Sequence, residues 1–343
     1  MKYMLGIETS CDDTSVAIVS EDFQILANRV SSQFEEHAPY MGVVPELACR
    51  AHLQNIPVVY RQAMDQAGLK LEDLTAIAVT QGPGLIGSLM VGVNFAKGLA
   101  YGSGLPLIGV NHIRGHVAAL FLEHAQIPLP ALALIVSGGH THLLHVDENR
   151  SLTLLTKSRD DAAGEAFDKL SKMLGLGFPG GPAIDRLAGD GDGTAFQFSM
   201  PRFSDGSKDY SFSGLKSAAA RFIERDPENF QQGRPGLNNI CASFQAAVVH
   251  QLLHRVKLGI KKEQPVSLLL GGGVACNSGL RAGLLDLGQR MNLPVFPTSP
   301  KLSTDNAAMI AAEGWSLYGK GQVMGFQETA DIRLKPFDGV RLL

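Results

Sequence analysis

The sequence predicts an α/β protein that is built from two similar halves. A strand-like run at residues 3–7, a polar turn and a second strand-like run at 16–19 indicate a β-hairpin. The same pattern returns at 131–136 and 143–146, around a turn that contains two adjacent glycines. In each half an apolar strand that ends in glycine then leads into a helix, which is the repeating unit of α/β folds. These observations indicate an internal duplication.

Helix and strand signals alternate between the two predicted hairpins. We expect a helix over about 45–68 and a strand at 76–80. This strand ends in Gln-Gly-Pro-Gly, which breaks regular structure before a helix over about 88–100. A further short apolar run at 105–108 is typical of a buried strand.

The second half follows the same plan after a less regular middle. A helix is predicted to start within 160–169, whereas the Gly/Pro-rich stretch 177–182 cannot lie inside a helix. That stretch is either a simple connector or, together with Asp185, one wall of a ligand cleft. The remaining predicted elements are a strand at 266–270, a glycine turn at 271–273, a helix from 277, a strand at 294–296 and a helix over about 301–318.

Composition and charge restrict the classes of function. A length of 343 residues favours two domains, and 45% hydrophobic with 18% charged residues is typical of a well-buried globular protein. The net charge is −3 and the isoelectric point is near 6.4. Proteins that hold nucleic acid unaided present a dense basic surface, and this composition does not predict one.

Cysteine spacing and hydropathy indicate the compartment. Cys11, Cys49, Cys241 and Cys276 form no closely spaced pair, so neither a zinc knuckle nor a redox motif is predicted, and scattered thiols suit a reducing environment. The acidic Glu8 stands too early for a signal peptide. No apolar run approaches the roughly 20 residues that a membrane span needs. We therefore expect a soluble, cytoplasmic protein.

Two histidines one helical turn apart are the first chemical signal. Asn111 is a good N-cap, so we expect a helix that begins at His112 and carries His116 on the same face. Two imidazoles in this arrangement can bind one metal ion, provided that a third ligand comes from elsewhere. The alternative is two unrelated histidines, one beside a cap and one packed in the core.

Three polar or glycine-rich turns follow predicted strands, at 9–13, 137–141 and 271–273. Backbone amides in such turns can bind phosphate, although glycine turns also simply end strands. Two such hairpin turns in a duplicated frame resemble the actin, hexokinase and heat-shock chaperone ATPase fold. That resemblance implies two RNase H-like lobes with a nucleotide cleft between them.

A series of motifs resembles one family within this fold, the TsaD family of tRNA N6-adenosine threonylcarbamoyltransferases, of bacterial type, formerly labelled O-sialoglycoprotein endopeptidases. The resemblance runs from residue 4 to about 315, and the motifs occur in the order of the family. One departure is Asp13, where many members carry glutamate. The motifs are GIETSCD at 6–12, VVPELA at 43–48, HIRGHV at 112–117, VSGGHT at 136–141, AGEAFDK at 163–169, YSFSGLK at 210–216 and TDN at 304–306.

The resemblance implies domains and ligands. We expect an N-terminal lobe over 1–113 with a returning helix at about 305–320, a C-terminal lobe over 114–304 with the nucleotide and metal cleft, and an extension over 325–343. The implied metal ligands, for one Fe²⁺ or Zn²⁺ per subunit, are His112, His116 and Asp305. The implied residues for an adenine nucleotide, which is threonylcarbamoyl-AMP as substrate or ATP or ADP in the same site, are Ile135, Val136, Ser137, Gly138, Gly139, Asp168, Gly181, Asp185 and Asn277.

The implied reaction is an acyl-type transfer. The threonylcarbamoyl group moves from its adenylate to the exocyclic amine of the adenosine 3′ of the anticodon, in tRNAs that read ANN codons. The main demands are orientation and stabilisation of negative charge, which a metal can supply. A base must accept the amine proton, and Asp12 and Asp13 are the residues we expect in that role.

The resemblance also implies partners. They are tRNA, a paralogous non-catalytic subunit of the same fold, a small P-loop ATPase and an upstream threonylcarbamoyl-AMP synthase; a homodimer is possible when the chain is alone. We expect the paralogue to bind within 43–60, unless these residues pack into the chain's own core. The apolar and small residues there include Val44, Leu47, Ala48, Ala51, Ile56 and Val59.

Three other functions make different demands on the sequence. A sugar kinase of the same fold would not need the histidine pair and Asp305. A metallopeptidase of the H-E-x-x-H type needs a glutamate directly after the first histidine, where this chain has Ile113. A non-catalytic scaffold related to the partner subunit would lack the metal ligands that are present here.

Overall fold

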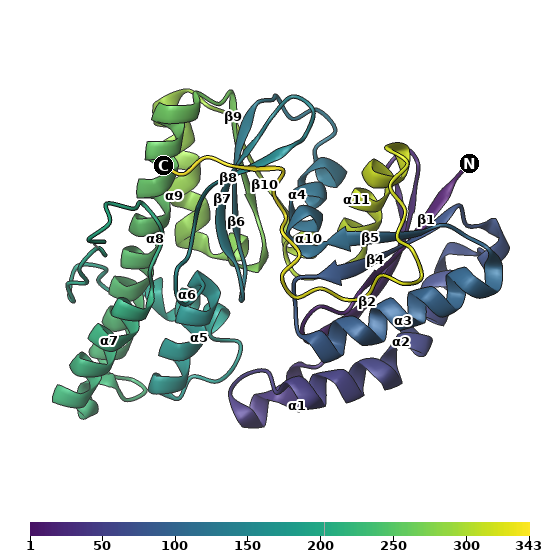
Figure 1. Ribbon diagram of the computed structural model, residues 1–343. Helices are drawn as coiled ribbons and strands as arrows, with labels where there is room; N and C mark the ends of the chain where they lie inside the picture. The colour runs from purple at the N-terminus through teal and green to yellow at the C-terminus, as the bar shows by residue number, and fades with distance from the viewer. Residues whose placement is uncertain (202) are drawn as a thin grey trace. The chain divides into compact units, whose positions relative to one another are not determined.

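A computed structural model describes residues 1–201 and 203–343 (Figure 1). The chain forms two compact units, residues 1–125 with 304–336, and residues 126–303 with 337–343. The boundary predicted after residue 113 therefore lies twelve residues too early, because the helix α4 (His112–Glu123) packs against α11 (Ala307–Gly319) of the first unit. The predicted C-terminal extension also divides between the two units instead of standing apart.

The first unit contains a five-stranded mixed sheet in the order β3-β2-β1-β4-β5. β1, β2 and β3 are antiparallel neighbours, whereas β4 and β5 add in parallel to β1. The predicted hairpin is thus confirmed, with one further antiparallel strand. The strands are β1 (Tyr3–Glu8), β2 (Asp13–Ser20), β3 (Ile25–Ser32), β4 (Ala76–Gly82) and β5 (Leu107–Asn111).

Helices cover both faces of this sheet (Figure 1). α2 and α3 pack on one face, where their apolar residues join those of β1 and β2 in one core, and α4 and α11 lie on the other face. The helical segments, apart from α4 and α11, are α1 (Phe34–His37), η1 (Ala38–Tyr40), α2 (Pro45–Ala67), η2 (Leu71–Asp73) and α3 (Ile86–Ser103).

The second unit repeats this plan. Its sheet has the order β10-β9-β6-β7-β8-β11, so β8-β7-β6-β9-β10 corresponds strand for strand to the sheet of the first unit. Again the first three strands, β6, β7 and β8, are antiparallel neighbours, whereas β9 and β10 add in parallel to β6. The predicted internal duplication is therefore present. The strands are β6 (Ala131–Val136), β7 (Thr141–Val146), β8 (Leu152–Lys157), β9 (Ser267–Gly271), β10 (Val295–Pro297) and β11 (Gly339–Val340).

A long central helix organises the helical part of the second unit. α8 (Pro235–Glu263) packs against β6 and β7 and against the neighbouring helices α6, α7 and α9. Within the described residues, every helix of the chain is too short or too polar to cross a lipid bilayer. The other helical segments are α5 (Ala163–Leu174), α6 (Gly180–Ala188), α7 (Ser213–Arg225), η3 (Pro227–Phe230), η4 (Gly273–Cys276), α9 (Ser278–Met291) and α10 (Pro300–Ser303).

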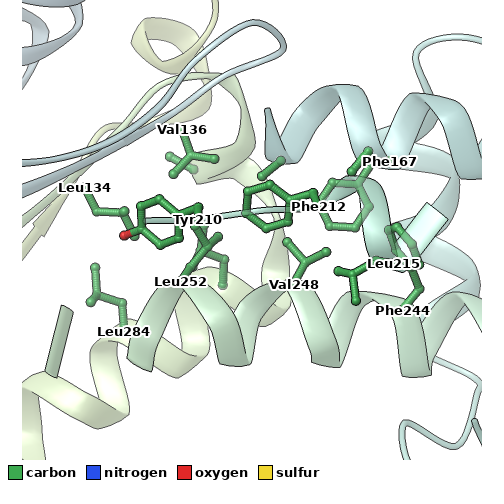
Figure 2. Close-up of a cluster of buried hydrophobic side chains, with 14 of the residues drawn as sticks. Leu134, Val136, Phe167, Tyr210, Phe212, Leu215, Phe244, Val248, Leu252 and Leu284 are labelled. Atoms are coloured by element: carbon green, nitrogen blue, oxygen red, sulfur yellow. The ribbon is translucent and has the colours of Figure 1, made fainter. Parts of the chain in front are cut away.

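The core of the second unit explains the aromatic residues of the YSFSGLK motif. Tyr210 and Phe212 are fully buried, with their rings stacked at a centroid distance of 6.1 Å. Figure 2 shows both rings above α8, near Val248 and Leu252, with Phe167 of α5 beyond them. Burial of large aromatic side chains is among the strongest contributions to a core. The aromatic part of this motif therefore stabilises the fold, and its side chains are not exposed to a ligand.

Candidate active site

The helix α4 begins where the sequence predicted. The Asn111 side chain accepts hydrogen bonds from the backbone amides of Ile113, at 2.9 Å, and Arg114, at 3.3 Å. This cap satisfies amides that would otherwise lack partners, so the helix starts at His112 and places His116 one turn further along the same face. The two imidazole rings lie with their centroids 4.7 Å apart.

The start of α11 supplies the carboxylate. Asn306 caps α11 through a hydrogen bond from the amide of Met309, and Asp305 immediately precedes that cap. Asp305 Oδ1 lies 3.4 Å from Nε2 of His112 and 3.3 Å from Nε2 of His116. Each of the three residues presents one potential ligand atom, and these atoms all lie within 4.8 Å of one another. The structure therefore brings together the three residues expected to bind a metal.

Small residues allow α11 to approach closely enough to deliver Asp305. A Cβ atom on Gly6 of β1 would lie 2.2 Å from the carbonyl oxygen of Ala307, and one on Gly115 would lie 2.9 Å from Cδ1 of Ile310. The amide of Ala307 also donates to Ser15 Oγ of β2 at 2.9 Å. The position of Asp305 is thus determined by contacts of α11 with both the sheet and α4.

The chemistry of His116 fits a metal ligand. This side chain is fully buried, its Nδ1 has no hydrogen-bond partner among the described residues, and its Nε2 lies 3.3 Å from Asp305 Oδ1. Burial lowers the pKa of His116, which favours the neutral imidazole that binds metals. A buried polar atom without a partner is costly, and a divalent cation among these three residues would satisfy it.

His112 differs from His116 in its electrostatic surroundings. Burial disfavours its charged form, but the carboxylates of Asp305 and Glu8 outweigh burial and raise the pKa of His112 to about 9. A cluster that attracts a proton this strongly has an excess of negative charge. A metal cation can take the place of that proton, because His112 must lose the proton on Nε2 before this nitrogen can bind a metal.

Asp12 and Asp13 lie where the first hairpin turns into β2. Burial is the main cause that raises the pKa of both carboxyl groups, and the pKa of Asp13 reaches about 7. The negative charge of Asp305 adds to both increases, which reflects their common surroundings. A carboxyl group that titrates near neutral pH can accept a proton under physiological conditions.

The second hairpin provides an open glycine turn. The backbone amide of Ser137 donates to the carbonyl of His140 at 2.8 Å, and the amides of Gly164 and Glu165 donate to the carbonyls of Ser137 and Gly138. A Cβ atom on Gly138 or Gly139 would meet nothing within 4 Å. Glycine is therefore not required here by contacts within the protein, and the turn leaves its backbone accessible to a ligand.

Ile135 and Val136 differ from the rest of this predicted loop. Both are residues of β6 and are fully buried, so their side chains belong to the core. Only their backbone could contribute to a site at the end of the strand. The resemblance implied a continuous loop over 135–139, whereas the structure begins the turn at Ser137.

The remaining nucleotide residues form two local groups. Asp168 of α5 accepts a hydrogen bond from the amide of Gly180 at 2.7 Å, which ties the start of α6 to α5 and leaves Gly181 in open space. Asp185 of α6 accepts from Ser278 Oγ at 2.7 Å and from Asn277 Nδ2 at 3.2 Å. These contacts fix the start of α9 next to α6.

Sequence reasoning missed two members of these networks. Gln245 of α8 accepts from Asn277 Nδ2 at 2.8 Å and thereby orients the amide that caps α9. Glu8, at the end of β1, lies with Oε2 only 3.0 Å from His112 Nδ1. Glu8 was visible in the sequence as part of the first motif, but no sequence spacing links it to a histidine 104 residues away.

The fold has solved counterparts. A component of (R)-2-hydroxyglutaryl-CoA dehydratase from Acidaminococcus fermentans matches 93% of this chain and its own full length with a TM-score of 0.54 at 15% identity. HypF from T. kodakarensis matches 93% of this chain and 48% of its own length with a TM-score of 0.61 at 14% identity. These neighbours have the actin- and hexokinase-like fold, so the predicted fold class is confirmed.

Similarity in sequence identifies the family. The family model for tRNA N6-adenosine threonylcarbamoyltransferase, TsaD, matches residues 24–312. A protein of that name from Thermosipho africanus is 48% identical over 318 residues, which are 93% of this chain and 95% of the relative. Another, from Geobacter sp. strain M21, is 45% identical over 99% of this chain and 98% of its own length. The chain belongs to the TsaD family of tRNA N6-adenosine threonylcarbamoyltransferases.

Proposed function

We propose that the chain transfers a threonylcarbamoyl group from threonylcarbamoyl-AMP to the exocyclic amine of the adenosine 3′ of the anticodon, in tRNAs that read ANN codons. The product is N6-threonylcarbamoyladenosine. Support comes from relatives of that name that are similar over nearly the whole chain. The structural observation that carries the proposal is the convergence of two histidines and one aspartate beside a hairpin that bears two protonatable carboxylates.

Metal assistance is part of this proposal. His112, His116 and Asp305 would hold one Fe²⁺ or Zn²⁺, because two imidazoles and one carboxylate suit either ion. When bound, such an ion supplies Lewis-acid stabilisation of negative charge on oxygen. Ile113 is fully buried at the position where an H-E-x-x-H peptidase has its glutamate base, and this argues against peptide hydrolysis.

The chain's own residues have separate tasks in the transfer. Backbone amides of Gly138 and Gly139 bind the phosphate of the adenylate, and Asp168 and Asp185 orient its nucleoside. As the amine attacks, a C–N bond forms to the carbamoyl carbon, and the C–O bond to phosphate breaks to release AMP. The proton lost by the amine passes to a carboxylate, for which Asp13 is best suited because its pKa is about 7. Asp12 is the second carboxylate of this turn and the alternative acceptor.

A partner surface is proposed on the face formed by α2 and α3. Ala48, Ile56 and Val59 pack into the chain's own core, so they are not available to a partner. The exposed apolar residues of this face are instead Leu53 at 60%, Val58 at 53%, Ile86 and Met90. Of these, Leu53 and Met90 line a groove of about 380 Å³, together with Pro57 and Phe95. We propose that the paralogous subunit of the same fold binds there.

The charge of this chain favours tRNA binding by an assembly over binding by the chain alone. The net charge is −3, whereas unaided tRNA capture relies on basic groups that neutralise phosphates. We propose that tRNA is held by a composite surface of this chain and the paralogue. A small P-loop ATPase completes the assembly, and a separate synthase supplies the adenylate.

Reconstitution tests the whole proposal. Purified tRNA, threonine, bicarbonate, ATP and the adenylate-forming synthase are incubated with this chain, the paralogue and the ATPase, and nucleosides are measured by mass spectrometry. We expect N6-threonylcarbamoyladenosine only with the complete set. Absence of product from that set would contradict the proposed reaction, and multiple turnovers without the paralogue and ATPase would contradict the proposed assembly.

The partner surface has its own test. Leu53→Asp should abolish co-elution with the paralogue in size-exclusion chromatography, because it places a charge in the apolar groove. Val323→Asp changes an equally exposed apolar residue away from this groove and should leave the complex intact. Co-elution of the Leu53→Asp variant would exclude this face.

A further inference from the structure

Glu8 is a fully buried carboxylate with every oxygen engaged. It ends β1 and is 0% exposed. Its Oε1 accepts a hydrogen bond from the backbone amide of Ser10, and its Oε2 accepts one from Thr80 Oγ1 of β4. The register that pairs Ile7 with Val79 brings Thr80 beside Glu8 on the neighbouring strand. A buried carboxylate is tolerated only when donors compensate for lost water, and these donors hold Glu8 in one orientation.

The third partner of Glu8 is His112. Oε2 of Glu8 lies 3.0 Å from Nδ1 of His112, and Ser10 Oγ lies 3.1 Å from the same nitrogen. A ring nitrogen that faces a carboxylate carries hydrogen, because a carboxylate can only accept. The other nitrogen, Nε2, lies 3.4 Å from Asp305 Oδ1. When a cation takes the place of the proton between these two atoms, Nε2 presents its lone pair to that cation.

We propose that Glu8 is a positioning residue of the metal centre. It accepts the Nδ1 hydrogen of His112, which turns Nε2 toward Asp305 and His116 and increases the basicity of that nitrogen as a ligand. The inference rests on the proposed metal at His112, His116 and Asp305. It assigns Glu8 a role that is separate from binding the ion and from contacting the substrate.

The second histidine shows that this support is specific. Nδ1 of His116 is buried and has no hydrogen-bond partner among the described residues, so no acceptor supports this ring from the Nδ1 side. Packing of α4 against α11 through Gly115 holds it instead. The two histidines are therefore oriented by different means: of these two, His112 has a charged acceptor at Nδ1 and His116 does not.

Zinc affinity provides the first test. The metal-free protein is titrated with Zn²⁺ against a competing chelator, and wild type is compared with Glu8→Gln, which keeps the shape but removes the charge. We expect affinity to fall by roughly 10- to 100-fold, as is usual for a residue that supports a ligating histidine. Glu313→Gln is the matched control, because Glu313 is also a buried carboxylate and its Oε1 lies 2.7 Å from Nε of Arg114 in α4.

The hydrogen bond itself provides the second test. In zinc-loaded protein with ¹⁵N-labelled histidine, the Nδ1 proton of His112 should appear far downfield and exchange slowly with water. Glu8→Gln should move this signal upfield and speed its exchange, because a neutral acceptor forms a weaker bond than a carboxylate. The signals of His116 should stay in place. A residue that only stabilised the fold would not change one imidazole proton selectively.

Thr80→Val is the variant to test if Glu8→Gln does not fold. It removes one donor to Glu8 with little change in shape and should weaken zinc binding by less than the roughly 10-fold that is the smallest loss expected for Glu8→Gln.

The outcomes separate the two proposals. A wild-type chain that binds no zinc would overturn the metal proposal and this inference together. A wild type that binds zinc, with Glu8→Gln unchanged in affinity or in the His112 signal, would overturn only the role of Glu8. An equal loss in Glu313→Gln would also overturn it, because the effect would then follow from any buried charge near α4.

Discussion

Each unit carries a pair of neighbouring histidines, and the two pairs differ in charge. In the first unit, carboxylates outweigh burial and raise the pKa of His112 to about 9. In the second unit, burial together with Lys157 lowers the pKa of His142, which stacks on His140 at 5.7 Å, to about 4. The rings of His112 and His142 are both almost completely buried. Charged neighbours therefore explain why His112 and His142 shift in opposite directions. Carboxylates beside the first pair favour a cation, whereas Lys157 beside His142 does not.

The turns beside these histidine pairs also differ in charge. The first hairpin carries Asp12 and Asp13, whereas the second carries Gly138 and Gly139 with open space around them. Acidic groups bind metals and protons, and exposed backbone amides bind anions. Duplication thus gave two equivalent positions that have opposite chemical preferences.

The largest effect is expected from removing a histidine of the first pair. His116→Ala should lose most of its metal and reduce activity by roughly 100-fold or more, because a ligating group is removed and not merely its support. Metal content by mass spectrometry and the thermal unfolding curve are measured together. His142→Ala, in the second pair, should keep full metal content. Full metal occupancy in a folded His112→Ala/His116→Ala variant would contradict the assignment.

Asp13, in the turn of the first hairpin, should make the stability of the protein depend on pH. The pKa of Asp13 rises from 3.8 to about 7 on folding, so between these values the native state binds a proton that the unfolded state does not. Stability therefore falls as pH rises through this window, by about 3 kcal/mol for metal-free protein. Asp13→Asn should remove that loss, which denaturant unfolding at pH 5 and pH 8 measures. If the free energy of unfolding changed equally between pH 5 and pH 8 in wild type and variant, Asp13 would not be the residue responsible.

The second pair should give the opposite dependence. The pKa of His142 falls from 6.5 to about 4 on folding, so in this window the unfolded state binds the extra proton. Its contribution to stability is complete above pH 6.5 and decreases as pH falls toward 4, by about 2 kcal/mol. His142→Phe should lack this decrease in urea unfolding at pH 7 and pH 4.5. If the variant lost as much stability as wild type between pH 7 and pH 4.5, His142 would not be the cause of the loss.

The smallest effect is expected at the glycine turn. Gly138→Val should weaken adenine-nucleotide binding at least tenfold, about 1.4 kcal/mol, because a side chain would block approach to the backbone amides. A Cβ at Gly138 meets no protein atom within 4 Å, so the melting temperature should not change. Calorimetry that shows unchanged affinity would exclude this turn from the nucleotide site.

Several elements could be predicted because their signals are local. The hairpins, the Asn111 cap and the start of α4 follow from residue periodicity and from side chains that bond to amides two or three positions away. The family motifs added Asp305 as a third ligand, which no local pattern indicated. The cytoplasmic location and the partners stay predictions.

Other features were wrong or invisible in the sequence. The predicted boundary after 113 cut through α4, because the helix belongs to the unit that contains its packing partner α11 and not to the sequence that follows it. The helix expected over 301–318 is interrupted at 304–306, where Asn306 caps a new helix and leaves Asp305 outside the regular structure.

The sequence by itself determined the duplicated α/β plan, the histidine pair and the family. Only the tertiary structure decided which residues surround those histidines. Glu8 and Asp305 are brought to His112 by strand register and by close contacts at Gly6 and Gly115, over separations of 104 and 193 residues. Residue type determines what a side chain can do, but its protonation and its role depend on neighbours that the chain supplies only by folding.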